Sequence, residues 1–279
     1  MVETGISTHA FAHNRLDRKI IDRIANAGFD AVELYMHKPH FNFDDRAVVQ
    51  EIVESIKESG LKLNSIHCPF YRQVEDAEAG KWLNITSDNE NLRKESVDWI
   101  KRSLSLAEKI DIGFAVIHFG DINDKELTES IWENANKSLA EINEHAKSLG
   151  ITLTLENINN GIATCRMLKD FLNKYRFDEE IGICFDVGHA AIDGEIFSGI
   201  RAFKRNIKTV HLHDTVNYED EHMVPGEGIL NWHDILKELK VNGYNGRLIL
   251  ENKWGETPGK TIKDAAKAAR KLAKTWDKL

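Results

Sequence analysis

Short apolar runs alternate with longer amphipathic runs from one end of the chain to the other. The short runs, rich in β-branched residues, predict strands, and the long runs, with apolar residues at helical spacing, predict helices. The predicted strands are Val2–Thr8, Ala31–Met36, Leu61–His67, Phe114–His118, Ile151–Glu156, Ile181–Asp186, Ile207–His213 and Arg247–Glu251. The predicted helices are Asp17–Ala27, Asp45–Ser59, Glu90–Lys109, Lys125–Ser148, Thr164–Tyr175, Glu195–Lys204, Trp232–Lys240 and Thr261–Lys274. Several helices end at a glycine just before the next strand, as in NAGFD and ESGLK, because glycine readily adopts the left-handed conformation that ends a helix.

The strict alternation of strand and helix predicts a parallel sheet. Repeated over the whole 279-residue chain, it favours an α/β fold with a single domain, a (β/α)8 TIM barrel spanning residues 1–279. An open dinucleotide-binding sheet would carry a GxGxxG motif after the first strand, where this chain reads THAFAHNR. The predicted strands are evenly spaced except between the third and the fourth, where residues 69–88 form an extra loop. We predict that this loop is a lid.

Composition narrows the classes of function. Lys and Arg number 37 against 45 for Asp and Glu, and the resulting charge of −8 gives no general attraction to nucleic acid or to an anionic membrane. No run approaches about 18 uninterrupted apolar residues. We therefore expect a cytoplasmic protein that does not bind a membrane. The three cysteines, Cys68, Cys165 and Cys184, are too scattered for a disulfide framework, and we expect Cys68 and Cys184 to point away from any site and pack in the core.

Residues that can hold a metal collect at the carboxyl ends of six consecutive predicted strands, where TIM barrels build their active sites. The third, fourth, fifth and eighth predicted strands each contribute one such residue: His67, His118, Glu156 and Glu251. The sixth strand contributes Asp186 and, one turn later, His189. The seventh strand contributes His211, His213 and Asp214, and the loop after it contributes Asp220 and His222. One such residue alone is more often a hydrogen-bonded loop residue. However, Glu156 and Glu251 each end an apolar strand, where a carboxylate needs a cation or a hydrogen-bond partner. Imidazoles and carboxylates without thiolates indicate a catalytic site for a divalent metal, Zn²⁺, Mn²⁺, Co²⁺ or Fe²⁺.

These motifs resemble those of the xylose isomerase-like TIM barrel superfamily, which contains sugar and sugar-phosphate isomerases and epimerases together with endonuclease IV. The resemblance implies that Glu156, Asp186, His211 and Glu251 hold a metal, and that the two glutamates also transfer the proton. The resemblance to endonuclease IV implies up to three ions per chain. The additional ligands would then be His67, His118, His189, Asp220 and His222, with Glu156 bridging two ions.

Two motifs favour the sugar enzymes over the nuclease. The chain reads Asp-Val-Gly-His from Asp186 and His-Leu-His-Asp from His211, where endonuclease IV usually shows Asp-Thr-Cys-His and His-Leu-Asn-Asp. The loop cations available for DNA are few and lie among acidic residues: Arg15, Lys38, Arg72 and Lys81. We therefore predict a metal-dependent isomerase or epimerase that acts through an enediolate between two glutamates, on a sugar or sugar phosphate. The alternative is an endonuclease IV-like AP endonuclease. A non-catalytic barrel would be expected to have lost a central ligand, and none is lost.

Side chains around the predicted ligands would contact the substrate. His189 and His222 would hold sugar hydroxyls in a one-metal enzyme, and Trp254 is the third predicted substrate-binding residue. The flanking aromatic residues Phe70, Tyr71 and Trp82 could complete an apolar wall for a sugar. The sequence leaves open which sugar is bound, how many ions are held, and whether the chain forms a homo-oligomer.

Overall fold

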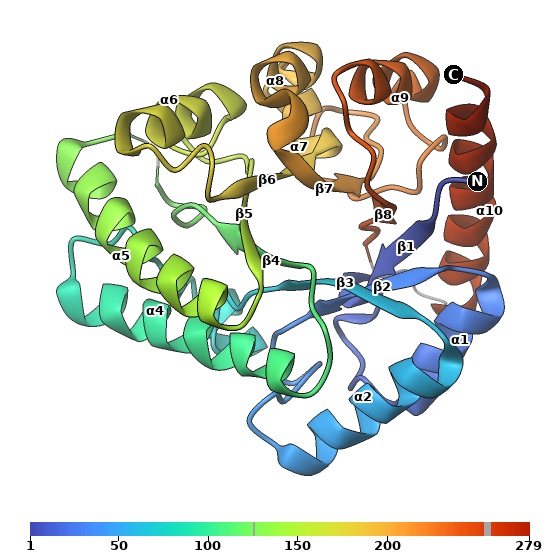
Figure 1. Ribbon diagram of the computed structural model, residues 1–279, viewed down its shortest axis with the longest axis horizontal. Helices are drawn as coiled ribbons and strands as arrows, with labels where there is room; N and C mark the ends of the chain where they lie inside the picture. The colour runs from blue at the N-terminus through green and yellow to red at the C-terminus, as the bar shows by residue number, and fades with distance from the viewer. Residues whose placement is uncertain (125, 254–257) are drawn as a thin grey trace.

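The computed structural model describes residues 1–124, 126–253 and 258–279 and shows a closed parallel barrel surrounded by helices (Figure 1). Its strands are β1 (Thr4–Ser7), β2 (Ala31–Tyr35), β3 (Lys62–His67), β4 (Phe114–His118), β5 (Thr152–Glu156), β6 (Gly182–Asp186), β7 (Ile207–Leu212) and β8 (Leu248–Leu250). Each strand pairs in parallel with the next along the chain, and β1 closes the barrel against β8 with Gly5 opposite Ile249. The predicted (β/α)8 TIM barrel is confirmed.

The helices of the outer layer match the predicted ones: α1 (Arg18–Ala27), α2 (Arg46–Ser59), α4 (Glu90–Leu104), α5 (Glu129–Ser148), α6 (Cys165–Tyr175), α8 (Ile196–Phe203), α9 (Trp232–Val241) and α10 (Pro258–Lys278). Short helical segments lie in the loops: α3 (Val74–Glu78), α7 (Val187–Ile192) and the 3₁₀ turns η1 (Thr8–Phe11), η2 (Ser105–Glu108) and η3 (Lys204–Asn206). The predicted helix 90–109 is thus divided, because its last turns wind more tightly as η2.

Local capping chemistry sets the helix boundaries. The carboxylate of Asp17 accepts a hydrogen bond from the backbone N–H of Ile20 at 3.0 Å and starts α1, and Gly28 ends it with a φ of 91°. Helix α5 begins at Glu129, later than the predicted start at residue 125, because the Thr128 hydroxyl caps it there. The Thr128 cap therefore determines where α5 begins, rather than the amphipathic pattern.

Alternation along each strand separates the barrel interior from the helix layer. In β6, Phe185 points outward and packs against Phe203 of α8, with ring centroids 6.5 Å apart. Cys184 and Asp186, on either side of Phe185, therefore face the interior. The same alternation in the neighbouring strands directs polar side chains toward the barrel axis. The polar side chains nearest the carboxyl ends of the strands line the mouth of the barrel.

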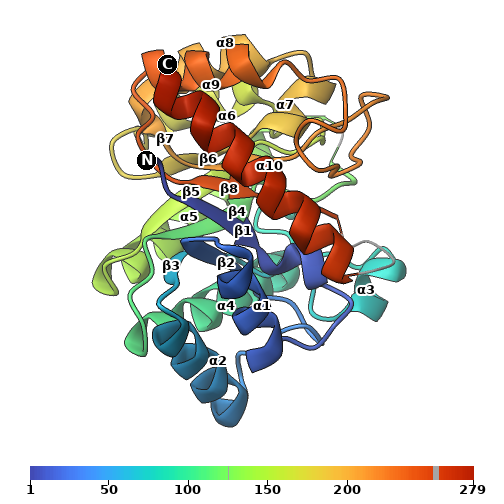
Figure 2. The same ribbon diagram turned by 90° about the vertical axis from the view of Figure 1, so that its right-hand side faces the viewer.

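The mouth lies at the end of the barrel from which α3 and the long loop after β7 project, opposite the N-terminus (Figure 2). The predicted lid, residues 69–88, contains α3. Among the described residues, no helix is both long enough and apolar enough to cross a membrane.

Candidate metal centre at the barrel mouth

Four buried side chains meet at the mouth, and they are the four that the family resemblance implies as metal ligands: Glu156, Asp186, His211 and Glu251. They come from the ends of β5 and β6, from β7, and from the residue after β8. The Nδ1 atom of His211 lies 2.8 Å from Glu156 Oε1, 3.1 Å from Glu251 Oε2 and 3.9 Å from Asp186 Oδ2. One ligand atom of each residue lies within 4.8 Å of those of the others. We call this group the four-ligand site.

The charge of the four-ligand site is not balanced by its own side chains. Three carboxylates surround one imidazole, and Asp186 Oδ2 is buried without a hydrogen-bond partner. Burial alone would raise the pKa of Glu156, but the charge of His211 and hydrogen bonds from His118, His211 and His67 hold it well below its ordinary value. The pKa of Glu251 is lowered well below its ordinary value in the same way, since His211 outweighs burial. An ionised, water-excluded set of this kind fits a divalent cation.

Two further histidines lie against the other oxygen of Glu156. The Nε2 atoms of His67 and His118, at the ends of β3 and β4, lie 3.1 and 3.2 Å from Glu156 Oε2. His67 Nδ1 lies 3.2 Å from the backbone carbonyl oxygen of Cys68, which leaves Nε2 directed at the carboxylate. Glu156 therefore stands between the four-ligand site and this histidine pair, with one oxygen directed to each.

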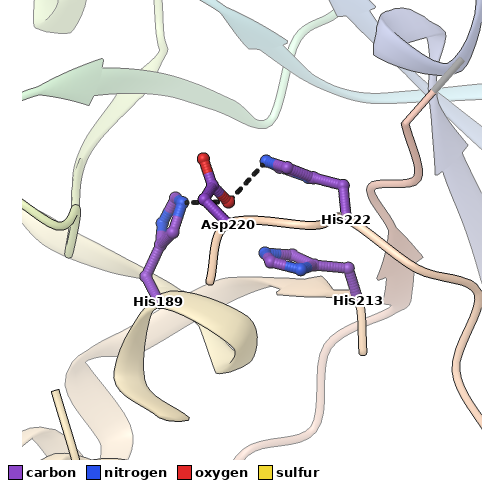
Figure 3. Close-up of side chains that lie close together, drawn as sticks. All are labelled: His189, His213, Asp220 and His222. Carbon is purple, nitrogen blue, oxygen red and sulfur yellow. Dashed lines mark ion pairs between the residues drawn. The ribbon is translucent and has the colours of Figure 1, made fainter. Parts of the chain in front are cut away.

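A third group forms around Asp220, in the loop after β7 (Figure 3). His189 and His222 approach Asp220 Oδ1 from opposite sides, with Nε2–Oδ1 distances of 3.3 and 3.0 Å. Their Nδ1 atoms lie 2.9 Å from the backbone carbonyl oxygens of Asn157 and Glu251, respectively. These carbonyls accept the Nδ1 protons and turn the Nε2 atoms toward Asp220. Histidines that bind metals are usually oriented in this way.

Asp214 explains how the loop after β7 brings this group together. Its buried carboxylate accepts hydrogen bonds from the backbone N–H groups of Gly226 and Leu230 and from the indole of Trp232, at 2.8, 3.1 and 2.8 Å. This anchors the loop that follows Asp220. His222 adopts a φ of 47°, a left-handed conformation that costs energy for any residue but glycine. The anchored loop holds this strained residue in place.

His213, which the sequence places among the residues that can hold a metal but outside the ligand sets that the resemblance implies, belongs to the third group. Its ring stacks on that of His222 with centroids 4.0 Å apart, and both ring nitrogens are buried without a hydrogen-bond partner (Figure 3). Nε2 nevertheless lies 3.0 Å from Asp186 Oδ1. Gly188 makes room for the ring, because a Cβ atom at that position would lie 1.9 Å from His213 Cε1. The glycine of Asp-Val-Gly-His and the second histidine of His-Leu-His-Asp are therefore sterically matched.

Aromatic rings line one side of the mouth. Phe70 stacks on His118 with centroids 4.2 Å apart and on Trp82 with centroids 6.1 Å apart, while the hydroxyl of Tyr71 lies 3.0 Å from that of Tyr35. Phe70, Tyr71 and Trp82 thus lie where the sequence places an apolar wall. The fourth predicted aromatic contact, Trp254, lies outside the described residues.

The prediction for Cys184 is wrong. Its thiol lies inside the barrel, close to Glu156 and His211, because residues 184 and 186 have the same parity and Asp186 points inward. Burial raises the pKa of this thiol well above its ordinary value. Cys68 does lie away from the site, with its sulfur 3.8 Å from the Ser103 hydroxyl of α4.

Comparison with known proteins agrees with the fold and the motifs. The family model described as xylose isomerase-like TIM barrel matches residues 21–274. An uncharacterized protein of Methanocaldococcus jannaschii is 30% identical, covering 95% of this chain and 86% of its own length. Fructoselysine 3-epimerase of Escherichia coli O157:H7 is 23% identical over 90% of each chain. D-Psicose 3-epimerase of Agrobacterium fabrum is 26% identical, covering 87% of this chain and 82% of its own.

The solved structures give the same result. A D-tagatose 3-epimerase-like protein is 28% identical to this chain, with a TM-score of 0.80 and coverage of 99% of this chain and 97% of its own. The two bacterial relatives named above for an activity are both sugar 3-epimerases.

Proposed function

Because this chain belongs to the xylose isomerase-like TIM barrel family, we propose that it is a divalent-metal-dependent 3-epimerase of a ketose or a ketose derivative. The observation that carries the proposal is the four-ligand site, in which two glutamates from β5 and from the end of β8 reach one histidine nitrogen. The aromatic wall beside this site suits the apolar faces of a sugar ring or chain.

The residues present fit a metal. Glu156, Asp186, His211 and Glu251 would hold it, and the buried, unpartnered Oδ2 of Asp186 is a free donor for it. The donor set favours Mn²⁺, Co²⁺, Zn²⁺ or Fe²⁺. Such an ion supplies Lewis acidity that stabilises negative charge on a carbonyl oxygen. The histidine pair and the group around Asp220 would hold one further ion each, or water and substrate hydroxyls instead.

Glu156 and Glu251 are the proposed acid and base. In a 2-ketose the hydrogen on carbon 3 is acidified by the neighbouring carbonyl. One carboxylate removes that proton, and the other, after taking up a proton from water, delivers it to the opposite face of the same carbon. The first carboxylate then returns its proton to water. The two glutamates come from strands three places apart in the ring, which suits attack on opposite faces. General acid–base catalysis of this kind contributes about 10²–10⁴-fold to the rate.

Residues around the four-ligand site are proposed to bind the substrate and to exclude water. His189 and His222 are proposed to contact substrate hydroxyls where no further ion is held. The predicted lid, residues 69–88, is proposed to exclude water from the bound sugar, since its aromatic residues reach the ligands.

Turnover of a small panel of ketoses tests the proposal. Purified protein loaded with Mn²⁺ or Co²⁺ should interconvert at least one of D-psicose, D-tagatose or fructoselysine with its 3-epimer, as measured by chromatography. The metal-free protein and Asp186→Ala should not. If no ketose is converted by protein shown to contain metal, the epimerase proposal fails.

The histidine pair and the group around Asp220 favour one alternative, a multi-metal phosphodiesterase acting on abasic DNA. The loop cations argue against it, because Arg72 is held by Glu95 at 2.6 and 2.7 Å and Lys38 by Asp44 at 2.6 Å. A nuclease needs about 6–10 phosphate contacts for strong binding. We expect little incision of an abasic duplex at physiological salt. Efficient incision that disappears in His118→Ala would favour the nuclease instead.

A further inference from the structure

A fully buried carboxylate lies behind the four-ligand site and has no part in the mechanism above. Glu33, in the middle of β2, points into the barrel and is 0% exposed. Its Oε2 accepts a hydrogen bond from the Ser65 hydroxyl of β3 at 2.7 Å and lies 3.1 Å from His211 Nε2. Its Oε1 is buried without a hydrogen-bond partner. A buried, half-satisfied carboxylate is costly, so its presence calls for a role.

The contacts of His211 indicate that role. Its two ring nitrogens face opposite ways: Nε2 faces Glu33, and Nδ1 faces Glu156 and Glu251 at 2.8 and 3.1 Å. A neutral imidazole carries its proton on one nitrogen and offers a lone pair on the other. Since a carboxylate can only accept, Glu33 keeps a proton on Nε2, just as Glu156 and Glu251 favour one on Nδ1 while no cation is present. When a cation takes the place of the Nδ1 proton, Glu33 still holds the Nε2 proton, and the lone pair is then on Nδ1, inside the four-ligand site.

We propose that Glu33 is a positioning residue that fixes His211 as an Nδ1 ligand, with Ser65 holding the carboxylate in place. This rests on the proposed metal dependence but adds a residue outside the ligand set. Glu33 holds the Nε2–H, prevents the ring from flipping, and keeps Nδ1 directed at the ion. Partners of this kind typically change metal affinity by about 10–100-fold when they are removed.

The matched variants are Glu33→Gln, Ser65→Ala and, as a control, Thr209→Val. Glu33→Gln keeps the shape but replaces an obligate acceptor by an amide that can also donate to Nε2, which would place the His211 proton on Nδ1. Thr209 is also a buried polar residue inside the barrel, two residues before His211, and its hydroxyl oxygen accepts from Asn64 at 3.2 Å without contacting Glu33.

Two readouts are needed, both with the metal alone. Calorimetric titration with Mn²⁺ should show affinity reduced about 10–100-fold in Glu33→Gln, less in Ser65→Ala, and unchanged in Thr209→Val. Proton–nitrogen NMR of ¹⁵N-histidine-labelled, Zn²⁺-loaded protein should show His211 protonated on Nε2 in the wild type and altered in Glu33→Gln. A merely structural role would lower the melting temperature of the metal-free protein and leave both readouts unchanged.

The outcomes separate this inference from the proposed function. Wild-type affinity and an unchanged His211 signal in Glu33→Gln overturn the role of Glu33, even if ketoses are epimerised. Affinity that depends on Glu33 in a protein that converts no ketose keeps this role and rejects the epimerase. A wild-type chain that binds no divalent metal rejects both.

Discussion

Glu156→Gln is expected to abolish turnover and to strip the metal from the four-ligand site. Glu156 uses both carboxylate oxygens, Oε1 toward His211 and Oε2 toward His67 and His118. The glutamine amide keeps the size of the glutamate side chain but loses its charge, and it presents an NH₂ group either to His211 or to His67 and His118. The variant therefore loses a ligand and a proton-transfer group together, and turnover should fall by at least about 10³-fold.

Metal analysis and turnover, measured on the same preparation, check this expectation. The matched control is Glu129→Gln, because Glu129 forms an exposed ion pair with Lys174 on the outer helices, and such pairs contribute about 1 kcal/mol or less. The control should keep normal metal content and rate. Near-normal turnover in Glu156→Gln would remove Glu156 from both of its proposed roles.

Removing the metal should have the second largest effect, on activity and stability together. The buried carboxylates of Glu33, Glu156, Asp186 and Glu251 all lie near His211, and a bound cation offsets their repulsion. An ion present at about 100 times its Kd stabilises the folded state by about 2.7 kcal/mol. For a chain of this size that corresponds to a rise of about 5 °C in Tm.

Dialysis against a chelator, followed by calorimetry and assay, measures both effects. Turnover should vanish and Tm should fall, and readdition of Mn²⁺ or Co²⁺ should restore both. Glu129→Gln should respond in the same way as the wild type. Full turnover in protein shown by elemental analysis to be metal-free would exclude a metal-dependent reaction.

The fold was predictable from the sequence because two periodicities and a few capping residues determine it. The alternation of apolar residues locates every strand to within three residues at either end, and glycines such as Gly28 and Gly60 mark helix ends through their positive φ. The short helices α3 and α7 were missed, since five or six residues carry too little amphipathic pattern to be recognised.

The convergence of the candidate ligands was predictable where one of them ends a strand, as Glu156 and Asp186 do, because strand ends meet at the barrel mouth. Glu33 was missed because it lies in the middle of a strand. A signal was available, since a charged residue between apolar neighbours in AVELY requires a buried partner. His213 was recognised as a residue that can hold a metal but could not be placed in a particular group, because its position depends on the space beside Gly188, which is a tertiary feature.

Deuterium exchange tests the central claim most directly, because it follows the proton itself. The metal-loaded protein is incubated in D₂O with the ketose that it converts, or with D-psicose if none has been found, and NMR follows the hydrogen on carbon 3. We predict that deuterium enters at that carbon in both epimers, only in the presence of metal, and not in Glu156→Gln or Glu251→Gln. Conversion with full retention of the original hydrogen, or exchange that persists in either glutamate variant, would contradict proton transfer by these two glutamates.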